Sequence, residues 1–342
     1  MARRIICLFL ALVLTPALFA QTPLSIWATG QSGAVLLRID AATGVPTTVG
    51  ATGFAGTAPL AFHPDGTLYT FTQVMSTDPN VPEQFASLDP ATGHATLIGS
   101  PLAQRTRIMP LIVAPDGTIY AAGIFGPSAN KLLTIDRYTG QATEVGPFGV
   151  TMMMDLAYNS EGVLYGATQT ALYTIDTTTG AATAVATFSG NLIVGTAAKV
   201  MGITFAPDGS LYATDFVSAA AGNSSLYRVD AGTGVGVRIA NTHIAQIHSA
   251  DVQPPSPAER MGALADKIQT YGLNRGIARS FIAKLDAANA ALTDGVPLAA
   301  CDALTDFDSE LAALAGKKLT DSQASALKLD LTWTETSLNC PK

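Results

Sequence analysis

The sequence predicts an all-β five-bladed β-propeller followed by a small all-α helical bundle. Three observations lead to this fold class. A Pro-Asp-Gly-x-Leu-Tyr pattern recurs in four related copies, an Asp-x-x-Thr-Gly pattern recurs five times between them, and helical spacing replaces both after residue 254. The mean period of about 47 residues is close to one four-stranded propeller blade. We therefore expect a propeller at 22–254 and a helical domain at 255–342, preceded by a signal peptide at 1–20.

The composition allows a large folded core and argues against some partners. Of the 342 residues, 48% are apolar and 13% are charged, so a mainly disordered chain is not expected. The formal net charge is −7, and no block of basic residues interrupts the chain. An acidic chain of this kind is poorly suited to nucleic acids or anionic membrane surfaces.

The N-terminal residues have the form of a secretion signal. MARR carries two positive charges, IICLFLALVLTPALF is apolar, and Ala20 precedes the polar Gln21. The apolar run is short for a membrane span, and turn-rich sequence follows it. We expect cleavage after Ala20, a secreted protein in the extracellular space or periplasm, and no stable membrane insertion after cleavage. An uncleaved signal anchor is the alternative.

Each repeat is interpreted as four strands. An apolar strand such as LIVAP leads through an Asp-Gly turn to a second strand such as TIYAA, and a third strand ends at an Ile-Asp pair or its equivalent. A tight Asp-x-x-Thr-Gly turn then leads to the fourth strand. An Asp side chain caps such turns while Gly adopts the positive φ that other residues resist. We therefore interpret the repeated aspartates as turn residues rather than as ligands.

The two ends of the repeat region are expected to form one blade and to close the ring. There are five third strands but only four Asp-Gly turns. LSIWATG places Trp27 where the other repeats have a tyrosine, so it is a second strand without a first. HSADVQP ends at Pro254 and matches a first strand without a second. Pairing the two would remove an exposed sheet edge.

The repeats resemble those of known extracellular proteins. They lack the Gly-His and Trp-Asp signatures of WD40 blades. The pattern is similar to extracellular bacterial propellers related to the NHL and YVTN repeat families, over residues 22–254. This resemblance implies a fold and does not imply a function.

Four helices are expected after the propeller. Ser256 opens a capping box with Glu259, and Gly272 follows that helix. A second helix is expected at about 275–292. A third is expected at about 298–315, with Leu298 on its apolar face, and a fourth from the Thr320 capping box to about residue 338.

Cys301 and Cys340 are expected to form a disulfide. If the third and fourth helices are antiparallel, the start of one lies beside the end of the other, and the two cysteines meet. Such a disulfide in a small secreted bundle stabilises it by about 3–4 kcal/mol. A metal pair or a reactive thiol remains the alternative, although no third ligand lies nearby in the sequence.

The helical segment resembles the FIMAH family. The resemblance rests on FIAKLDAANAALTDG followed by CDALTDFDSELAALAGKKLTDSQASAL. It implies an extracellular location and an accessory role beside other domains. It supplies no catalytic residues.

The sequence contains no recognisable catalytic motif. Gly-x-Ser-x-Gly, the phosphate-binding Gly-Lys-Ser/Thr loop and His-Glu-x-x-His are all absent. His243 and His248 match no metal-ligand spacing, and the innermost strands offer only Asp155 and Asp251 as acids. We expect no catalytic residue, metal or cofactor and predict a non-catalytic binding protein. An extracellular hydrolase or lyase with an unrecognised site in the propeller channel is the alternative.

The two ends of the predicted propeller differ. The Asp-Gly turns and the Asp-x-x-Thr-Gly turns have constant spacing, and both lie at one end, which we name the turn face. The opposite end, the loop face, carries the loops between second and third strands and the connections between blades. There the interval from blade aromatic to turn aspartate varies from 11 residues (Tyr165–Asp176) to 20 (Tyr69–Asp89). Varied loops on a rigid frame favour binding of a glycan, peptide or protein at this face, and neutral drift in loop length is the alternative.

A candidate ligand site lies where the innermost strands begin, at the loop-face end of the central channel. Small and apolar residues dominate there, including a repeated methionine that we interpret as packing. Four polar residues stand out: Arg107, Asp155, Lys199 and His248. Mixed polar groups around a concave mouth suit a small polar ligand; solvated residues that keep the mouth wet are the alternative. We expect Asp155 to be replaceable without loss of stability.

Overall fold

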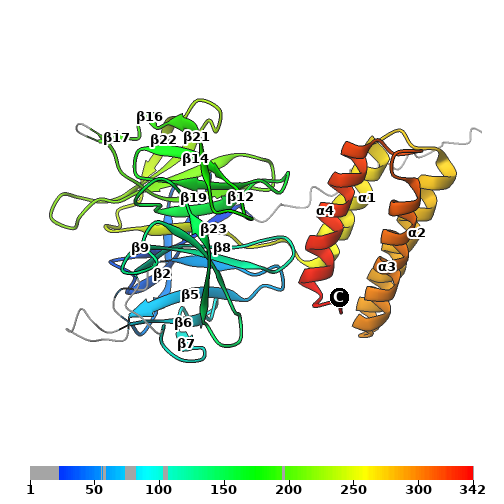
Figure 1. The fold of residues 1–342 in the computed structure, drawn as a ribbon, viewed down its shortest axis with the longest axis horizontal. Helices are drawn as coiled ribbons and strands as arrows, with labels where there is room; N and C mark the ends of the chain where they lie inside the picture. Colours follow the sequence, from blue (N-terminus) through cyan, green and yellow to red (C-terminus); the bar gives the residue numbers. More distant parts are fainter. Residues whose placement is uncertain are drawn as a thin grey trace, which may run out of the picture.

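The computed structural model describes residues 23–54, 56, 59–73, 82–102, 107–194 and 197–341. The predicted signal peptide at 1–20 lies outside these residues. Within them the chain forms a five-bladed β-propeller followed by four α-helices. Figure 1 shows the helices beside the propeller, with α4 nearest to it. No helix among the described residues has the length and apolar character needed to cross a membrane.

The first three blades each contain four antiparallel strands. From the inside outward, blade 1 consists of β23 (His248–Val252), β1 (Ser25–Gly30), β2 (Val35–Asp40) and β3 (Pro46–Ala51). Blade 2 consists of β4 (Leu60–Phe62), β5 (Leu68–Gln73), β6 (Glu83–Leu88) and β7 (Ala95–Leu97). Blade 3 consists of β8 (Arg107–Val113), β9 (Ile119–Phe125), β10 (Lys131–Ile135) and β11 (Ala142–Pro147).

The remaining elements follow the same order. Blade 4 consists of β12 (Asp155–Tyr158), β13 (Leu164–Ala167), β14 (Ala171–Ile175) and β15 (Ala182–Thr187). Blade 5 consists of β19 (Val200–Phe205), β20 (Leu211–Asp215), β21 (Ser225–Val229) and β22 (Val235–Asn241). A fifth strand, β16 (Ser189–Gly190), pairs with the outer side of β22. A separate hairpin consists of β17 (Ile193–Val194) and β18 (Ala197–Ala198). The helices are α1 (Pro257–Thr270), α2 (Arg275–Thr293), α3 (Pro297–Leu314) and α4 (Asp321–Ser337).

Blade 1 is assembled from two distant parts of the chain, as the sequence indicates. β23 pairs antiparallel with β1, and Trp27 lies opposite Asp251. The innermost strands contact one another in the order β4, β8, β12, β19, β23 and again β4. The blade aromatics pack between blades: the Trp27 ring meets Phe62 edge-on at 5.4 Å, and the Tyr165 ring lies 5.1 Å from Phe205.

The repeated aspartates are turn residues, which confirms the structural interpretation. Asp136 Oδ1 accepts hydrogen bonds from the Tyr138 and Thr139 backbone N–H groups and from Thr139 Oγ1. Gly140, which ends the same turn, has a φ of 70°, in the left-handed region that favours glycine. One short motif thus closes a hairpin in every blade.

Helices α1 and α4 begin at the capping residues that the sequence predicts. The Ser256 and Thr320 capping boxes are both formed. The four helices share one apolar core in which the Phe281 and Phe307 rings lie 4.6 Å apart. Leu298 is an exception and corrects our expectation, because its side chain is 65% exposed. It lies in the first turn of α3, outside the shared core.

The predicted disulfide is confirmed. Cys301 near the start of α3 and Cys340 just after α4 are bonded, with their Cα atoms 5.5 Å apart. The disulfide therefore joins the start of α3 to the end of α4.

The helical part lies against the turn face of the propeller. A Cβ atom built on Gly117 would lie 3.1 Å from the Thr336 methyl group, and one built on Gly162 would lie 3.1 Å from Leu329. Both glycines belong to Asp-Gly-type turns, and both helical residues belong to α4. The helices therefore cover part of the uniform end of the propeller and leave the loop face on the other side.

Candidate functional site

The four predicted site residues come from four different blades, at the same end of the channel. Arg107 is the first residue of β8, Asp155 the first of β12 and His248 the first of β23, while Lys199 immediately precedes β19. Because all four innermost strands run in the same direction, their first residues lie at the loop-face mouth. Comparing the repeats in the sequence therefore predicted the end of the channel at which these residues lie. The surroundings of the four side chains differ from one another.

The floor of the mouth is apolar. Met109, Met154 and Met201 form a buried cluster with Ile124, and Phe216 packs against it. The packing interpretation of the repeated methionine is confirmed. Flexible thioether side chains fill the space where strands of different blades converge.

His248 is the most unusual of the four residues. Its side chain is only 8% exposed, and its ring lies 5.2 Å from the ring of Phe216. Its Nδ1 atom has no hydrogen-bond partner among the described residues. Burial, together with the positive charge of Arg107, lowers the pKa of His248 to about 4. The ring is therefore neutral near pH 7 and carries an unsatisfied polar atom.

The backbone beside His248 is strained. Ser249 has a φ of 56°, a conformation rare for a non-glycine residue inside a strand. The pairing of β23 with β1 shifts register between Trp27 and Thr29, opposite this point. Bulges and strained residues of this kind are over-represented at functional sites, where they redirect a side chain.

Asp155 lies behind the mouth rather than in it. Its side chain is fully buried, and Oδ2 accepts hydrogen bonds from the Ile203 N–H at 2.9 Å and the Ala250 N–H at 3.1 Å. Ser249 Oγ lies 3.3 Å from Oδ1. Burial raises the pKa of Asp155 well above its usual value. This geometry contradicts the expectation that Asp155 can be replaced without loss of stability, because the carboxyl group joins β12 to both β19 and β23.

Arg107 is held by an acid that sequence reasoning missed. Its guanidinium donates to Glu83 Oε1 at 2.6 Å, and Glu83 Oε2 accepts from the Ile108 N–H at 2.7 Å. Glu83 is 2% exposed, and burial, opposed by Arg107, raises its pKa to about 7. Glu83 begins β6, a third strand, and it meets Arg107 of β8 only through the packing of blade 2 against blade 3, so no motif could have identified it.

Lys199 presents an exposed side chain at the mouth, and its carbonyl accepts a hydrogen bond from the Phe216 N–H at 2.9 Å. The structure thus places two cations and one neutral, unsatisfied histidine around the apolar floor. The two nearby acids, Glu83 and Asp155, are both buried and hydrogen-bonded.

The second innermost acid, Asp251, is also engaged by the backbone. Its Oδ2 accepts from the Phe62 N–H of blade 2 at 2.7 Å, and burial raises its pKa to about 7. Asp155 and Asp251 therefore satisfy the edge N–H groups of neighbouring blades. They do not face each other across an open cleft as the acid and base of a glycoside hydrolase do. No group of three metal-ligating side chains occurs among the described residues.

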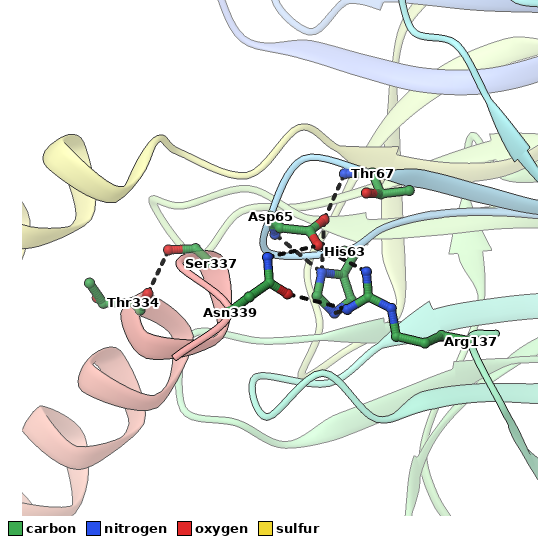
Figure 2. Close-up of polar contacts among 7 residues, drawn as sticks. All are labelled: His63, Asp65, Thr67, Arg137, Thr334, Ser337 and Asn339. Atoms are coloured by element: carbon green, nitrogen blue, oxygen red, sulfur yellow. Dashed lines mark hydrogen bonds and ion pairs between the residues drawn. The ribbon is translucent and has the colours of Figure 1, made fainter. Parts of the chain in front are cut away.

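A second polar cluster lies on the turn face, under the end of α4 (Figure 2). His63 Nδ1 lies 2.9 Å from Asp65 Oδ1, and Arg137 donates to Asp65 Oδ2 at 3.0 Å. Asn339 reaches the same cluster, 3.4 Å from Arg137 and 3.5 Å from Asp65. Burial opposes ionisation of Asp65, but hydrogen bonds from His63 and Thr67 hold its pKa well below the usual range. The cluster therefore links blades 2 and 3 to the helical part.

Comparisons with known proteins identify no family. No protein-family model and no curated protein matches the chain. Among solved structures, a protein of unknown function from Bacteroides caccae is 14% identical over 68% of this chain and 100% of its own, with a TM-score of 0.43. Two proteins proposed to be 6-phosphogluconolactonases are similar to the chain. The one from Bacteroides uniformis is 15% identical over 69% of this chain and 84% of its own, with a TM-score of 0.37. The one from Bacteroides fragilis is 12% identical over 68% and 99%, with a TM-score of 0.39. A likeness of this level assigns no activity to the chain.

Proposed function

We propose that the protein is a secreted, non-catalytic binding protein that holds its ligand at the loop-face mouth of the propeller. The observation that carries this proposal is His248, a nine-tenths-buried imidazole whose Nδ1 has no partner and whose neighbour Ser249 has a strained backbone. An unsatisfied buried polar atom destabilises a protein by about 1–3 kcal/mol unless a ligand or an ordered water supplies the hydrogen bond.

The wider loop face supports the same role. Several non-glycine residues with positive φ lie in its loops: Gln31, Ser32, Asn130, Met152, His243 and Gln246. Phe125, the register partner of Arg107, is 59% exposed, and Met152 is 37% exposed. Strained loops and exposed apolar side chains around a polar mouth suit recognition of a glycan, peptide or protein.

The roles of the four residues follow from their environments. Arg107 and Lys199 supply positive charge, and His248 supplies a neutral polar contact. Asp155 positions β23 from behind and does not touch the ligand. Because the buried acids are engaged by backbone N–H groups, a binding role is favoured over a hydrolase or lyase.

Other parts of the proposal concern origin and organisation. We propose a signal peptide at 1–20, a propeller at 22–254 of NHL- or YVTN-like type, and a FIMAH-like helical bundle at 255–342. We also propose that the β23–β1 pairing closes the ring. The disulfide Cys301–Cys340 supports export, since such bonds persist in oxidising compartments.

The test is a binding screen followed by substitution at the mouth. The secreted chain is applied to glycan and peptide arrays, and hits are measured with the parent, His248→Phe and Arg107→Gln. Each substitution is expected to weaken binding about tenfold or more, as expected for loss of a hydrogen bond to a charged or buried group. His243→Phe, on an exposed loop histidine of the same face, is the matched control. Hits that bind both mouth variants as tightly as the parent would show that the mouth is not the site.

A further inference from the structure

A second cavity lies at the opposite end of the channel, between the propeller and the helices. It has a volume of about 230 Å³, and its propeller wall includes Phe62, Tyr158 and Asp251. Its helical wall includes Arg260 of α1 and Trp333 of α4. The cavity is therefore formed only when the helical part rests on the turn face, and none of its residues belongs to the loop-face mouth.

Arg260 is a half-buried cation without an ion-pair partner among the acids of the described residues. Its guanidinium lies 4.9 Å from the centre of the Trp333 ring, and its Nε donates to the Pro255 carbonyl. Among the described residues Arg260 forms no ion pair, and the acid that acts on its charge, Asp330, is itself paired with Lys267. Burial lowers the pKa of Arg260 to about 10. Arg260 is half-buried, and Asp330, which also lines the cavity, is occupied by Lys267, so the guanidinium can bind the carboxylate of a ligand.

Asp251 lines the same cavity from the propeller side. Its carboxyl group is 9% exposed and is fixed by hydrogen bonds from the Phe62 and Val252 N–H groups. A cation and an acid thus line one cavity from two different structural parts without forming an ion pair with each other. Aromatic side chains from both parts fill the space beside them.

We propose that this cavity binds a small zwitterion, an α-amino acid with an apolar side chain. Its carboxylate pairs with Arg260, its ammonium group pairs with Asp251, and its side chain packs against Trp333, Tyr158 and Phe62. Paired opposite charges recognise a zwitterion better than a molecule that bears only one of them. The volume suits this class, because cavities of about 150 Å³ accept a benzene-sized molecule.

The two tryptophans of the chain allow a direct test with L-leucine as the probe. Trp333 lines the cavity, whereas Trp27 is buried in blade 1 and serves as an internal reference. In the full secreted chain with labelled tryptophan, L-leucine is expected to shift the Trp333 indole resonance in a saturable manner and to leave that of Trp27 unchanged. Absence of a saturable shift would overturn the proposal.

Singly charged analogues of L-leucine and substitutions of Arg260 and Asp251 test which charged groups contribute to binding. 4-Methylpentanoate lacks the ammonium group and isoamylamine lacks the carboxylate, and each is expected to bind about tenfold more weakly than L-leucine or worse. Arg260→Gln is expected to weaken L-leucine and 4-methylpentanoate, while Asp251→Asn is expected to weaken L-leucine and isoamylamine. Arg279→Gln, on an exposed arginine of α2, is the matched control.

Two outcomes would exclude this class of ligand even if the Trp333 resonance shifts. One is equal affinity for L-leucine and for either singly charged analogue. The other is unchanged affinity in Arg260→Gln. If Arg260→Gln melts below the parent, Arg260→Lys, which keeps the charge, replaces it. The affinity of Arg260→Lys for L-leucine is expected to lie between the affinities of the parent for L-leucine and for isoamylamine.

Discussion

The turn face and the loop face are built by the same repeat, yet they differ in how completely their polar groups are satisfied. On the turn face the aspartates of the hairpin turns accept hydrogen bonds from their own turn, and the glycines occupy the positive-φ positions. At the loop-face mouth a buried histidine lacks a partner and serine takes a conformation that suits glycine. A repeat therefore fixes local turns uniformly and leaves individual blades free to carry polar groups that the fold itself does not satisfy.

The largest expected effect is the loss of strand β23. Truncation at about Ala245 removes the innermost strand of blade 1 and exposes both the edge of β1 and the apolar faces of β4 and β19 that contact β23. We expect the whole propeller to unfold or to melt far below the parent, whereas truncation after Pro257, which removes only the helices, keeps the propeller folded. Circular dichroism melting of the two truncated chains checks this. Equal melting temperatures would contradict closure of the ring by β23.

The next effect on stability compares a buried aspartate behind the mouth with a turn aspartate. Asp155→Ala leaves the buried Ile203 and Ala250 N–H groups without an acceptor, so we expect a loss of about 2–4 kcal/mol in the free energy of unfolding. Asp136→Ala removes a cap from an exposed turn and is expected to lower stability by less. Urea denaturation measures both. A smaller loss for Asp155→Ala than for Asp136→Ala would show that this carboxyl group does not join the blades.

Sequence reasoning predicted the parts of the fold that depend on local chemistry. The turn motifs, the capping boxes at Ser256 and Thr320, and the partnership of Trp27 with the strand near Asp251 all follow from residue type and spacing. Sequence reasoning also predicted the end of the channel at which the mouth residues lie, because their positions in the repeats follow from the spacing of the turn motifs. It did not predict their exposure, because burial of Asp155 depends on how closely neighbouring blades approach.

The missed features depend on contacts between distant segments. Glu83 meets Arg107 only through the packing of blade 2 against blade 3, and Asn339 reaches Asp65 only because α4 lies on the turn face. Neither contact leaves a pattern within one segment of sequence. Leu298 was misplaced for a related reason, because helical periodicity identifies an apolar face but does not tell where the neighbouring helices stop covering it.

A pH titration should show the difference between Glu83 at the loop-face end and Asp65 on the turn face as opposite slopes of stability against pH. Burial raises the pKa of Glu83 at the mouth to about 7, so its contribution to stability is present at pH 4 and is lost as the pH rises to about 7. The pKa of Asp65 on the turn face is lowered, so its contribution is present at neutral pH and is lost as the pH falls below about 4. Urea denaturation from pH 3 to 8 measures both effects. Asp251, whose pKa is also raised to about 7, contributes in the same range, so Glu83→Gln should reduce the slope between pH 4.5 and 7 without abolishing it and should leave the fall in stability below pH 4 unchanged. An unaltered slope in that variant would remove Glu83 as a cause.

The smallest expected effect on stability is at His248, and its sign distinguishes a ligand site from a structural one. His248→Phe keeps an aromatic ring against Phe216 and removes a buried nitrogen that has no hydrogen-bond partner. Because no hydrogen bond of Nδ1 is lost, we expect the free energy of unfolding to stay within about 0.5 kcal/mol of the parent or to rise by about 1 kcal/mol. A residue that serves the fold would show the opposite sign, as Asp155 should. Urea denaturation of ligand-free protein measures the difference, with His243→Phe as the control on an exposed loop. A loss of more than about 1 kcal/mol in His248→Phe alone would mean that the imidazole is already satisfied inside the protein, and the loop-face mouth would then lose the unsatisfied group on which the proposed binding role depends.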